Sequence, residues 1–144
     1  MSVGRICTRS VDVAAPDESA QAAAIRMKTR NVGTLVVLDQ NQCPIGIVTD
    51  RDLVLCVVAK GLDPTMTELE VVMSTLPESV TENTPIEAAI GIMRRGAHRR
   101  LPVVDDDGQL VGLVTLDDVL SLLSEEFEEI GELVRKEAPT SSTL

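Results

Sequence analysis

Aromatic residues are almost absent from this chain of 144 residues, which has one phenylalanine, Phe127, and no tryptophan or tyrosine. Apolar residues nevertheless make up 44% of the sequence, so the core must be built from aliphatic side chains. A flat ligand would have to lie between aliphatic walls and backbone, because there is no ring on which it could stack. A chain of this length folds as one compact domain or as two small halves that share a core.

Positive charge is also scarce. The formal net charge is −10, and the chain has no basic stripe of the kind that holds DNA or RNA, so we expect no nucleic-acid partner. A small anion can still bind where positive charge is locally concentrated. The longest wholly apolar run, residues 53–59, is far shorter than the ~20 residues that span a bilayer. The N-terminus lacks the apolar segment of a signal peptide, and we expect a cytoplasmic protein without a membrane partner.

Groups that carry catalysis or bind metals are few. The three cysteines are odd in number and lack C-x-x-C spacing, which argues against a disulfide framework and against a zinc site. There is one histidine, no Walker A loop and no His-Glu-x-x-His motif. The acidic run from Asp105 to Asp107 ends at Gly108 and is more typical of a solvated hairpin turn than of a magnesium or calcium site. We therefore expect no catalytic residue, no metal and no required cofactor.

What the sequence does contain is a long repeat. The segment from Gly46 to Asp52 is echoed 66 positions later by the segment from Gly112 to Asp118. The same offset relates Ala22/Ala88, Met27/Met93, Leu35/Leu101, Val37/Val103, Asp39/Asp105 and Val48/Val114. A period this long, present twice, predicts two copies of one α+β unit packed as a pseudo-symmetric pair rather than a solenoid. We divide the chain into repeat 1 (1–66), repeat 2 (67–124), a C-terminal helical extension (125–138) and a disordered tail (139–144).

Each copy has the pattern of a helix, two strands and a second helix. In the first copy we expect a helix from Asp17 or Ser19 to about Asn31, strands at 35–38 and 44–48, and a helix at 50–60. In the second copy we expect a helix that Thr84 caps and Gly96 ends, with Glu87 completing a capping box. Strands at 101–104 and 110–114 and a helix from 116 to about 136 follow. The continuous apolar runs indicate strands covered on both faces.

The repeated segment reads as a strand that turns into a helix through a corner, Gly-x-x-Thr-x-x-Asp. The glycine leaves room for the close approach of a backbone or a ligand. The threonine, Thr49 or Thr115, can cap the helix, with Asp52 or Asp118 in its first turn. An ordinary helix start has the same residues, so the corner taken alone is better explained by structure than by function. Its duplication inside a larger repeat favours function.

The corner has the chemistry of a nucleoside-phosphate site. Free N–H groups at a helix start can receive a phosphate, and the threonine hydroxyl can donate to it. An ionised aspartate would repel phosphate but can accept two hydrogen bonds from the vicinal hydroxyls of a ribose. His98, Arg99 and Arg100 precede a strand of the second copy, where the first copy has Val32, Gly33 and Thr34. We therefore expect the site containing Thr115 to prefer the more highly charged anion, with Arg100 aimed at it.

The last predicted helix carries a heptad seam, in which apolar residues recur at steps of four and three. Its members are Leu116, Leu120, Leu123, Phe127, Ile130 and Val134. One interpretation is a long helix packed on its own body, and the other is a helix for self-association.

The segments Leu101 to Asp105 and Gly112 to Asp118, echoed in the first copy, resemble a tandem pair of CBS domains, also called a Bateman module. The resemblance covers roughly Ile6 to Ser124, and the first copy departs from it with Val36 in place of a proline. It implies two β-α-β-β-α units whose sheets pack together, with two clefts that bind adenosine compounds: AMP, ADP, ATP, S-adenosylmethionine or NAD. The implied ligand-binding residues are Thr8, Thr34, Ile47, Thr49, Asp52, Thr75, Arg99, Arg100, Leu113, Thr115 and Asp118.

By that resemblance, Asp52 and Asp118 hold ribose, while Thr49 and Thr115 hold phosphate. Ile47 and Leu113 would line the base slot, Arg99 and Arg100 would face phosphate, and the stretches around Thr8 and Thr75 would close the clefts. Such modules usually form homodimers and act as regulatory sensors, for example of cellular energy, through a regulated protein that the sequence does not name.

Three functions follow as hypotheses. The first is a non-catalytic sensor that binds an adenosine-containing nucleotide. The second is a protein-interaction or dimerisation adaptor in which the corners are only helix caps and no ligand binds. The third is a small enzyme that hydrolyses a magnesium-bound nucleotide with Asp52 and Asp118, but the sequence offers no base that would activate water.

Overall fold

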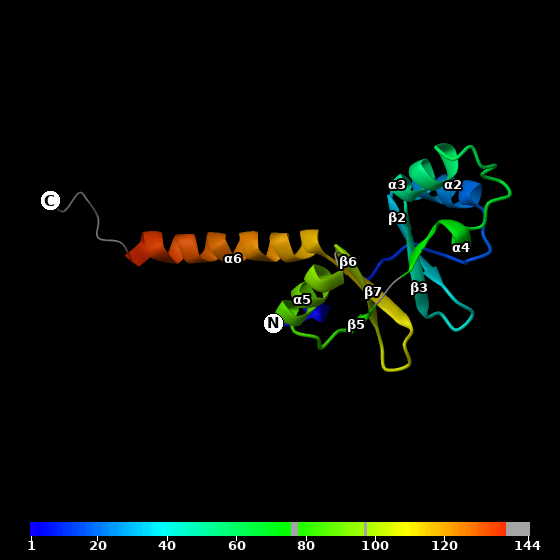
Figure 1. The fold of residues 1–144 in the computed structure, drawn as a ribbon. Helices are drawn as coiled ribbons and strands as arrows, with labels where there is room; N and C mark the ends of the chain where they lie inside the picture. Colours follow the sequence, from blue (N-terminus) through cyan, green and yellow to red (C-terminus); the bar gives the residue numbers. More distant parts are fainter. Residues whose placement is uncertain (76–77, 97, 138–144) are drawn as a thin grey trace.

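The computed structural model describes residues 1–75, 78–96 and 98–137, which form two lobes and one projecting helix (Figure 1). The first lobe contains β1 (Val13–Ala14), α2 (Ala20–Arg30), β2 (Thr34–Leu38), β3 (Pro44–Thr49), α3 (Asp50–Leu53), the π-helix η1 (Val54–Val58), α4 (Leu69–Val72) and β4 (Ser74–Thr75). The second contains α1 (Val3–Ile6), β5 (Val80–Thr81), α5 (Ile86–Gly96), β6 (Arg100–Val104), β7 (Leu110–Thr115) and the start of α6 (Leu116–Glu137). This confirms the predicted α+β class with two repeated units and a long C-terminal helix.

The two sheets follow one plan. In the first, β1 runs parallel to β2, and β2 pairs with β3 as an antiparallel hairpin in which Thr34 lies opposite Thr49. In the second, β5 runs parallel to β6, and β6 pairs with β7 so that Arg100 lies opposite Thr115. All but the first residue of β2 and of β6 are buried, as the continuous apolar runs predict.

Each sheet is completed by a segment that precedes the other copy in the sequence. Strand β4, which follows the first copy, pairs with β3, and Ser74 lies opposite Ile47. Thr8, near the N-terminus, pairs with Leu113 of β7 through two backbone hydrogen bonds of 2.9 Å. The short helix before each of these segments lies in the same lobe as the segment. Leu69 of α4 is buried in the core of the first lobe, and Val3 of α1 is buried in the core of the second. The two lobes are therefore joined by reciprocal crossings of the chain.

The lobes also share an apolar cluster between their sheets. Val36, Leu38 and Ile47 of the first sheet pack against Leu113 of the second, with Val11 and Leu110 at the margin. Burial of such aliphatic side chains contributes about 25 cal/mol per Å² of apolar surface removed from water, and here it holds the lobes together. The cluster places Ile47 of β3 and Leu113 of β7 next to each other between the two sheets.

Helix α2 begins and ends as its sequence indicates. The Ser19 side chain caps it by accepting a hydrogen bond from the Ala22 N–H (3.1 Å), and Asn31 ends it in the left-handed conformation with φ of 54°. Its buried residues, Ala20, Ala23 and Met27, belong to the same apolar cluster as the buried residues of the sheet.

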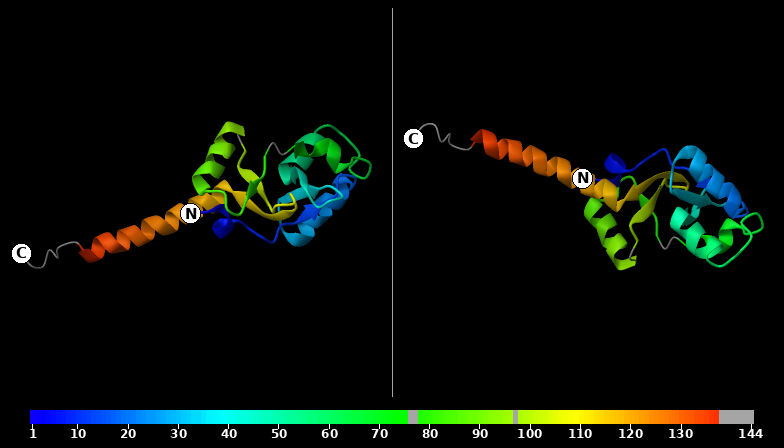
Figure 2. Two further views of the ribbon diagram at one scale, coloured as in Figure 1. Left: turned by 90° about the horizontal axis from the view of Figure 1, so that it is seen from below. Right: turned by 90° about the horizontal axis from the view of Figure 1, so that it is seen from above.

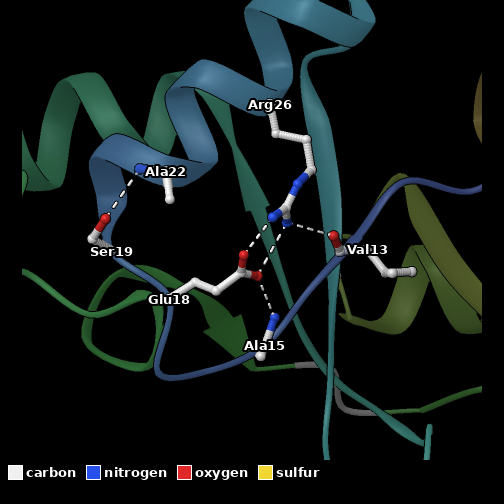
Figure 3. Close-up of polar contacts among 6 residues, drawn as sticks. All are labelled: Val13, Ala15, Glu18, Ser19, Ala22 and Arg26. Atoms are coloured by element: carbon white, nitrogen blue, oxygen red, sulfur yellow. Dashed lines mark hydrogen bonds and ion pairs between the residues drawn. The ribbon is translucent and has the colours of Figure 1, made fainter.

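The loop that leads into α2 is tied by a cluster of polar contacts (Figure 3). Glu18 accepts hydrogen bonds from the Ala15 N–H and from the Arg26 guanidinium, and Arg26 also donates to the Val13 carbonyl (2.8 Å). At the equivalent place in the second copy, the Thr81 N–H donates to Thr84 Oγ1 (3.0 Å). Thr84 thus closes the same loop and does not cap α5, which begins at Ile86, so the prediction of a capping box with Glu87 is wrong.

The predicted helix at 50–60 differs from a regular α-helix. It starts as α3 but continues as the π-helix η1, where the Ala59 N–H donates to the Val54 carbonyl (2.8 Å). The wider turn accommodates one extra residue. Leu53 and Val57 are consequently the buried residues here, whereas Val119 and Leu122, only three positions apart, are buried in α6.

Helix α6 projects away from both lobes, as Figures 1 and 2 show. Val119 and Leu122 pack on Ile86 and Ile6, but Phe127 is 72% exposed and Val134 61% exposed. The interpretation in which the whole helix packs on its own body is therefore wrong for its second half. The predicted tail at 139–144 lies outside the described residues.

Within the ranges 1–75, 78–96 and 98–137, no helix is both long enough and apolar enough to cross a membrane. The same ranges contain no group of three or more His, Cys, Asp or Glu side chains placed to hold a metal ion.

Candidate functional site

Both Gly-x-x-Thr-x-x-Asp corners are built as capping boxes. At the first corner, Thr49 Oγ1 accepts from the Asp52 N–H (3.1 Å), and Asp52 Oδ2 accepts from the Thr49 N–H (2.9 Å). Thr115 and Asp118 form the same two bonds at the same lengths. The sequence prediction of a helix cap is confirmed at both places. The caps leave each threonine hydroxyl hydrogen free to donate, because the oxygen acts as acceptor, and they use one oxygen of each carboxylate.

The corner glycines leave room for the backbone of a neighbouring segment rather than for a ligand. A Cβ on Gly112 would lie 2.9 Å from the Thr8 carbonyl oxygen, and one on Gly46 would lie 3.1 Å from the Ser74 carbonyl oxygen. These carbonyls belong to the crossing segments that complete each sheet. The glycines therefore allow Thr8 and Ser74 to approach the corners.

The first cleft has a volume of about 250 Å³ and draws on both copies. Ile47, Thr49 and Asp52 come from the end of β3 and the start of α3. Strand β4 adds Ser74 and Thr75, and the segment that enters β6 adds His98, Arg99 and Arg100. Arg99 and Arg100 are exposed and His98 is partly buried, so the basic groups line the open side of the cleft.

The second cleft, of about 270 Å³, is the pseudo-symmetric counterpart of the first. Leu113 takes the place of Ile47, and Thr8 takes that of Ser74. Positions equivalent to the basic segment are held by Val32, Gly33 and Thr34. Ser10, Val11 and Asp12 complete the lining.

A third pocket lies on the other side of the basic segment. It has a volume of about 270 Å³ and is lined by Arg99, Arg100, Thr115, Leu116 and Asp117. The segment is held there by its backbone, because the Leu116 N–H donates to the Arg99 carbonyl (2.8 Å). The two arginines thus border both the corner of their own copy and the cleft at the corner of the other copy.

The predicted site residues are distributed over these three places. The first cleft holds Ile47, Thr49, Asp52, Thr75, Arg99 and Arg100, and the second holds Thr8, Thr34 and Leu113. Thr115 lies in the third pocket, and Asp118 contacts it through the capping box. The described residues that line the second cleft include neither of these two.

Sequence reasoning did not select Ser74, His98 or Asp12 as site residues. Ser74 could have been found from the repeat, because it is the counterpart of Thr8. His98 belongs to the basic segment that the sequence singled out, but it was not included among the ligand-binding residues. Asp12 offered no local signal, since only the fold brings it beside Thr34.

Charge differs between the clefts. The first contains two arginines and one aspartate in addition to His98. In the second, Asp12 is the charged residue of the lining, with a side chain 16% exposed, and it accepts a hydrogen bond from Arg30 Nε (2.9 Å).

Burial raises the pKa of the nearby Cys7 thiol against the opposing effect of Arg9, so this cysteine is not activated as a thiolate.

Comparison with known proteins gives a consistent family. A model described as CBS domain matches the chain twice, over residues 3–59 and 68–125. An uncharacterized protein of Methanopyrus kandleri is 37% identical over 122 residues, which are 85% of this chain but only 62% of that protein. The CBS domain-containing protein YhcV of Bacillus subtilis is 39% identical over 118 residues, 82% of each chain. The solved structure of CBSX2 in complex with AMP has a TM-score of 0.70 and 26% identity, over 86% of this chain and 97% of that one.

Proposed function

This chain belongs to the CBS-domain family, and we propose that it is a non-catalytic regulatory module that binds adenosine-containing nucleotides in the clefts between its repeats. The observation that carries the proposal is the first cleft. Its lining combines a threonine hydroxyl, an aspartate and two arginines with the aliphatic side chain of Ile47. That set matches the three parts of a nucleotide: phosphate, ribose and base.

Each part of the ligand has a partner of suitable chemistry. The Thr49 hydroxyl can donate to phosphate while its oxygen remains bound to the Asp52 N–H. The free oxygen of the Asp52 carboxylate can accept from ribose hydroxyls, and charge-assisted bonds of this kind are about twice as strong as neutral ones. Arg99 and Arg100 can bind phosphate oxygens in a bidentate manner. The AMP complex of CBSX2, a protein 26% identical to this one, supports the same class of ligand.

The ligand class comprises AMP, ADP, ATP, NAD and S-adenosylmethionine. Isothermal titration calorimetry with each compound tests the proposal, and we expect at least one to bind with a Kd well below 1 mM, the range in which a sensor can respond. The sensor function is rejected if none binds below millimolar concentration. Steady release of product from ATP would instead favour an enzyme.

We also infer that the module is a homodimer and that α6 contributes to its contact. Leu120, Leu123, Phe127, Ile130 and Val134 form a stripe on α6 that is 46–72% exposed. Isolated helices of this kind are usually stabilised by the burial of such a stripe against a partner. A second copy of the chain supplies the same stripe and could bury it.

The exposed stripe also favours the second candidate, an interaction adaptor without a ligand. In that case the capping boxes at Thr49 and Thr115 serve only to start helices. The calorimetry distinguishes the two functions, because an adaptor shows no adenosine-dependent heat while it still self-associates.

A further inference from the structure

We propose that the two clefts select ligands of different charge: the first takes a phosphate-bearing nucleotide, and the second takes an adenosine compound without phosphate. This inference rests on the proposed function, since it assigns ligand classes to the clefts described above. It goes further in treating the pseudo-symmetric pair as two unlike sites in one chain.

The difference between the clefts is concentrated in one segment. Their apolar and hydroxyl positions correspond, with Ile47 matched by Leu113 and Ser74 by Thr8. The segment that enters the hairpin of the opposite copy does not correspond. It is His98, Arg99 and Arg100 in the first cleft but Val32, Gly33 and Thr34 in the second. The aliphatic residue and the residue of the crossing segment thus correspond in the two clefts, whereas the arginines that can bind phosphate line only the first of the two.

The lining of the first cleft has an excess of positive charge, and the lining of the second does not. Arg99 and Arg100 against Asp52 leave one net positive charge in the lining of the first cleft, with His98 counted as neutral. In the second, Asp12 is the one charged residue of the lining, and its ion pair with Arg30 offsets its negative charge. A phosphate is therefore attracted to the first cleft and meets no cationic side chain in the lining of the second, while a nucleoside without phosphate does not depend on this difference.

The arginines are available for a ligand. Among residues 1–75, 78–96 and 98–137 the ion pairs are Arg9–Glu82, Arg26–Glu18 and Arg30–Asp12, and none involves Arg99 or Arg100. Both also border the pocket of Thr115 and Asp117. A phosphate bound in the first cleft would draw both arginines toward Thr49 and away from Asp117. The corner at Thr115 would then attract an anion less strongly.

The experiment follows one backbone amide in each cleft by NMR while a ligand is added. Thr75 reports on the first cleft and Gly33 on the second. With AMP we expect the Thr75 signal to shift at a concentration about tenfold lower than the Gly33 signal, the effect of one charge-assisted contact. With adenosine we expect both signals to shift over the same concentration range.

Substitutions exchange the charge between the clefts. Arg100→Thr gives the first cleft the residue of the second, and we expect it to abolish the preference of AMP for Thr75. Thr34→Arg is the reciprocal change, and we expect it to lower the AMP concentration needed to shift Gly33. Arg94→Thr is the matched control, because it removes the same charge from an exposed position of α5 outside the cleft lining.

The inference is overturned if AMP shifts Gly33 first or shifts both signals together, or if Arg100→Thr changes no more than Arg94→Thr. Pyrophosphate separates this failure from that of the proposed function. If adenosine compounds shift neither signal but pyrophosphate shifts Thr75, the nucleotide function fails and the charge difference stands. If pyrophosphate also leaves Thr75 unchanged, both fail.

Discussion

Arg100 and Thr115 are cross-strand partners in the β6–β7 hairpin, yet Arg100 also lines the cleft that contains Thr49 of the other copy. The two sheets pack against each other through Ile47 and Leu113, so the start of one hairpin lies at the corner of the next. Each cleft therefore combines the corner of one copy with the entering segment of the other.

Asp52→Asn tests the ribose contact apart from the helix cap. The asparagine oxygen can still accept from the Thr49 N–H, so we expect the midpoint of urea denaturation to change little. The amide group that replaces the free oxygen donates where ribose hydroxyls need an acceptor, and we expect affinity for the nucleotide to fall about tenfold. Calorimetry measures this, and Asp118→Asn is the matched change at the other corner. Unchanged affinity in Asp52→Asn would contradict the ribose assignment.

Gly112→Ala tests the crossing of the N-terminal segment. Its Cβ would meet the Thr8 carbonyl oxygen at 2.9 Å, and the backbone cannot give way without weakening the pairing with Leu113. We expect a loss of about 1–3 kcal/mol in the free energy of unfolding, as for overpacked sites. Gly91→Ala on α5 is the control. Its Cβ contacts only an arginine side chain at 3.4 Å, and alanine is expected to stabilise the helix. Equal stability of both variants in urea would show that the crossing is not tight.

The Glu18–Arg26 pair predicts a pH dependence of stability. The hydrogen bond from Arg26 holds the pKa of the Glu18 carboxyl below its usual value, against the opposing effect of burial. The stabilisation is therefore present above the unfolded pKa of about 4.3 and is lost as the pH falls through the folded pKa. We expect Glu18→Gln to lower the urea midpoint at pH 7 and to have a smaller effect at pH 3. An equal loss at both pH values would mean that the carboxylate charge contributes nothing.

Phe127→Glu tests the role of α6 in self-association. Phe127 is 72% exposed in the single chain, so the substitution should leave its thermal midpoint unchanged. A charge in a buried apolar stripe is costly, and we expect the mass measured by light scattering to fall toward that of one chain. Ser121→Glu adds the same charge at an exposed position of α6 outside the stripe and should leave the mass unchanged. Truncation after Ser124 should act like Phe127→Glu. A stable dimer in both would place the contact elsewhere.

The sequence determined the units of this protein. Local rules suffice to cap a helix at Ser19 and at both Thr-x-x-Asp corners, since the bonds join residues three positions apart. The offset of 66 predicted two equivalent sheets, and the buried runs predicted β2 and β6. The π-helix η1 was missed, because its extra residue serves the packing of Val57 and leaves no local pattern.

Only the tertiary structure decided which segments share a cleft. The sequence places His98, Arg99 and Arg100 in the copy of Thr115, and the charge was expected at that corner. Packing through Ile47 and Leu113 also brings them to Thr49 and Asp52, while Thr34 and Asp12 meet at the second cleft. The physical reason is that helix caps and hairpins join residues close together in the sequence, whereas the burial of apolar faces is not directional and joins residues far apart. Which faces meet, and what charge they bring together, depends on the whole chain.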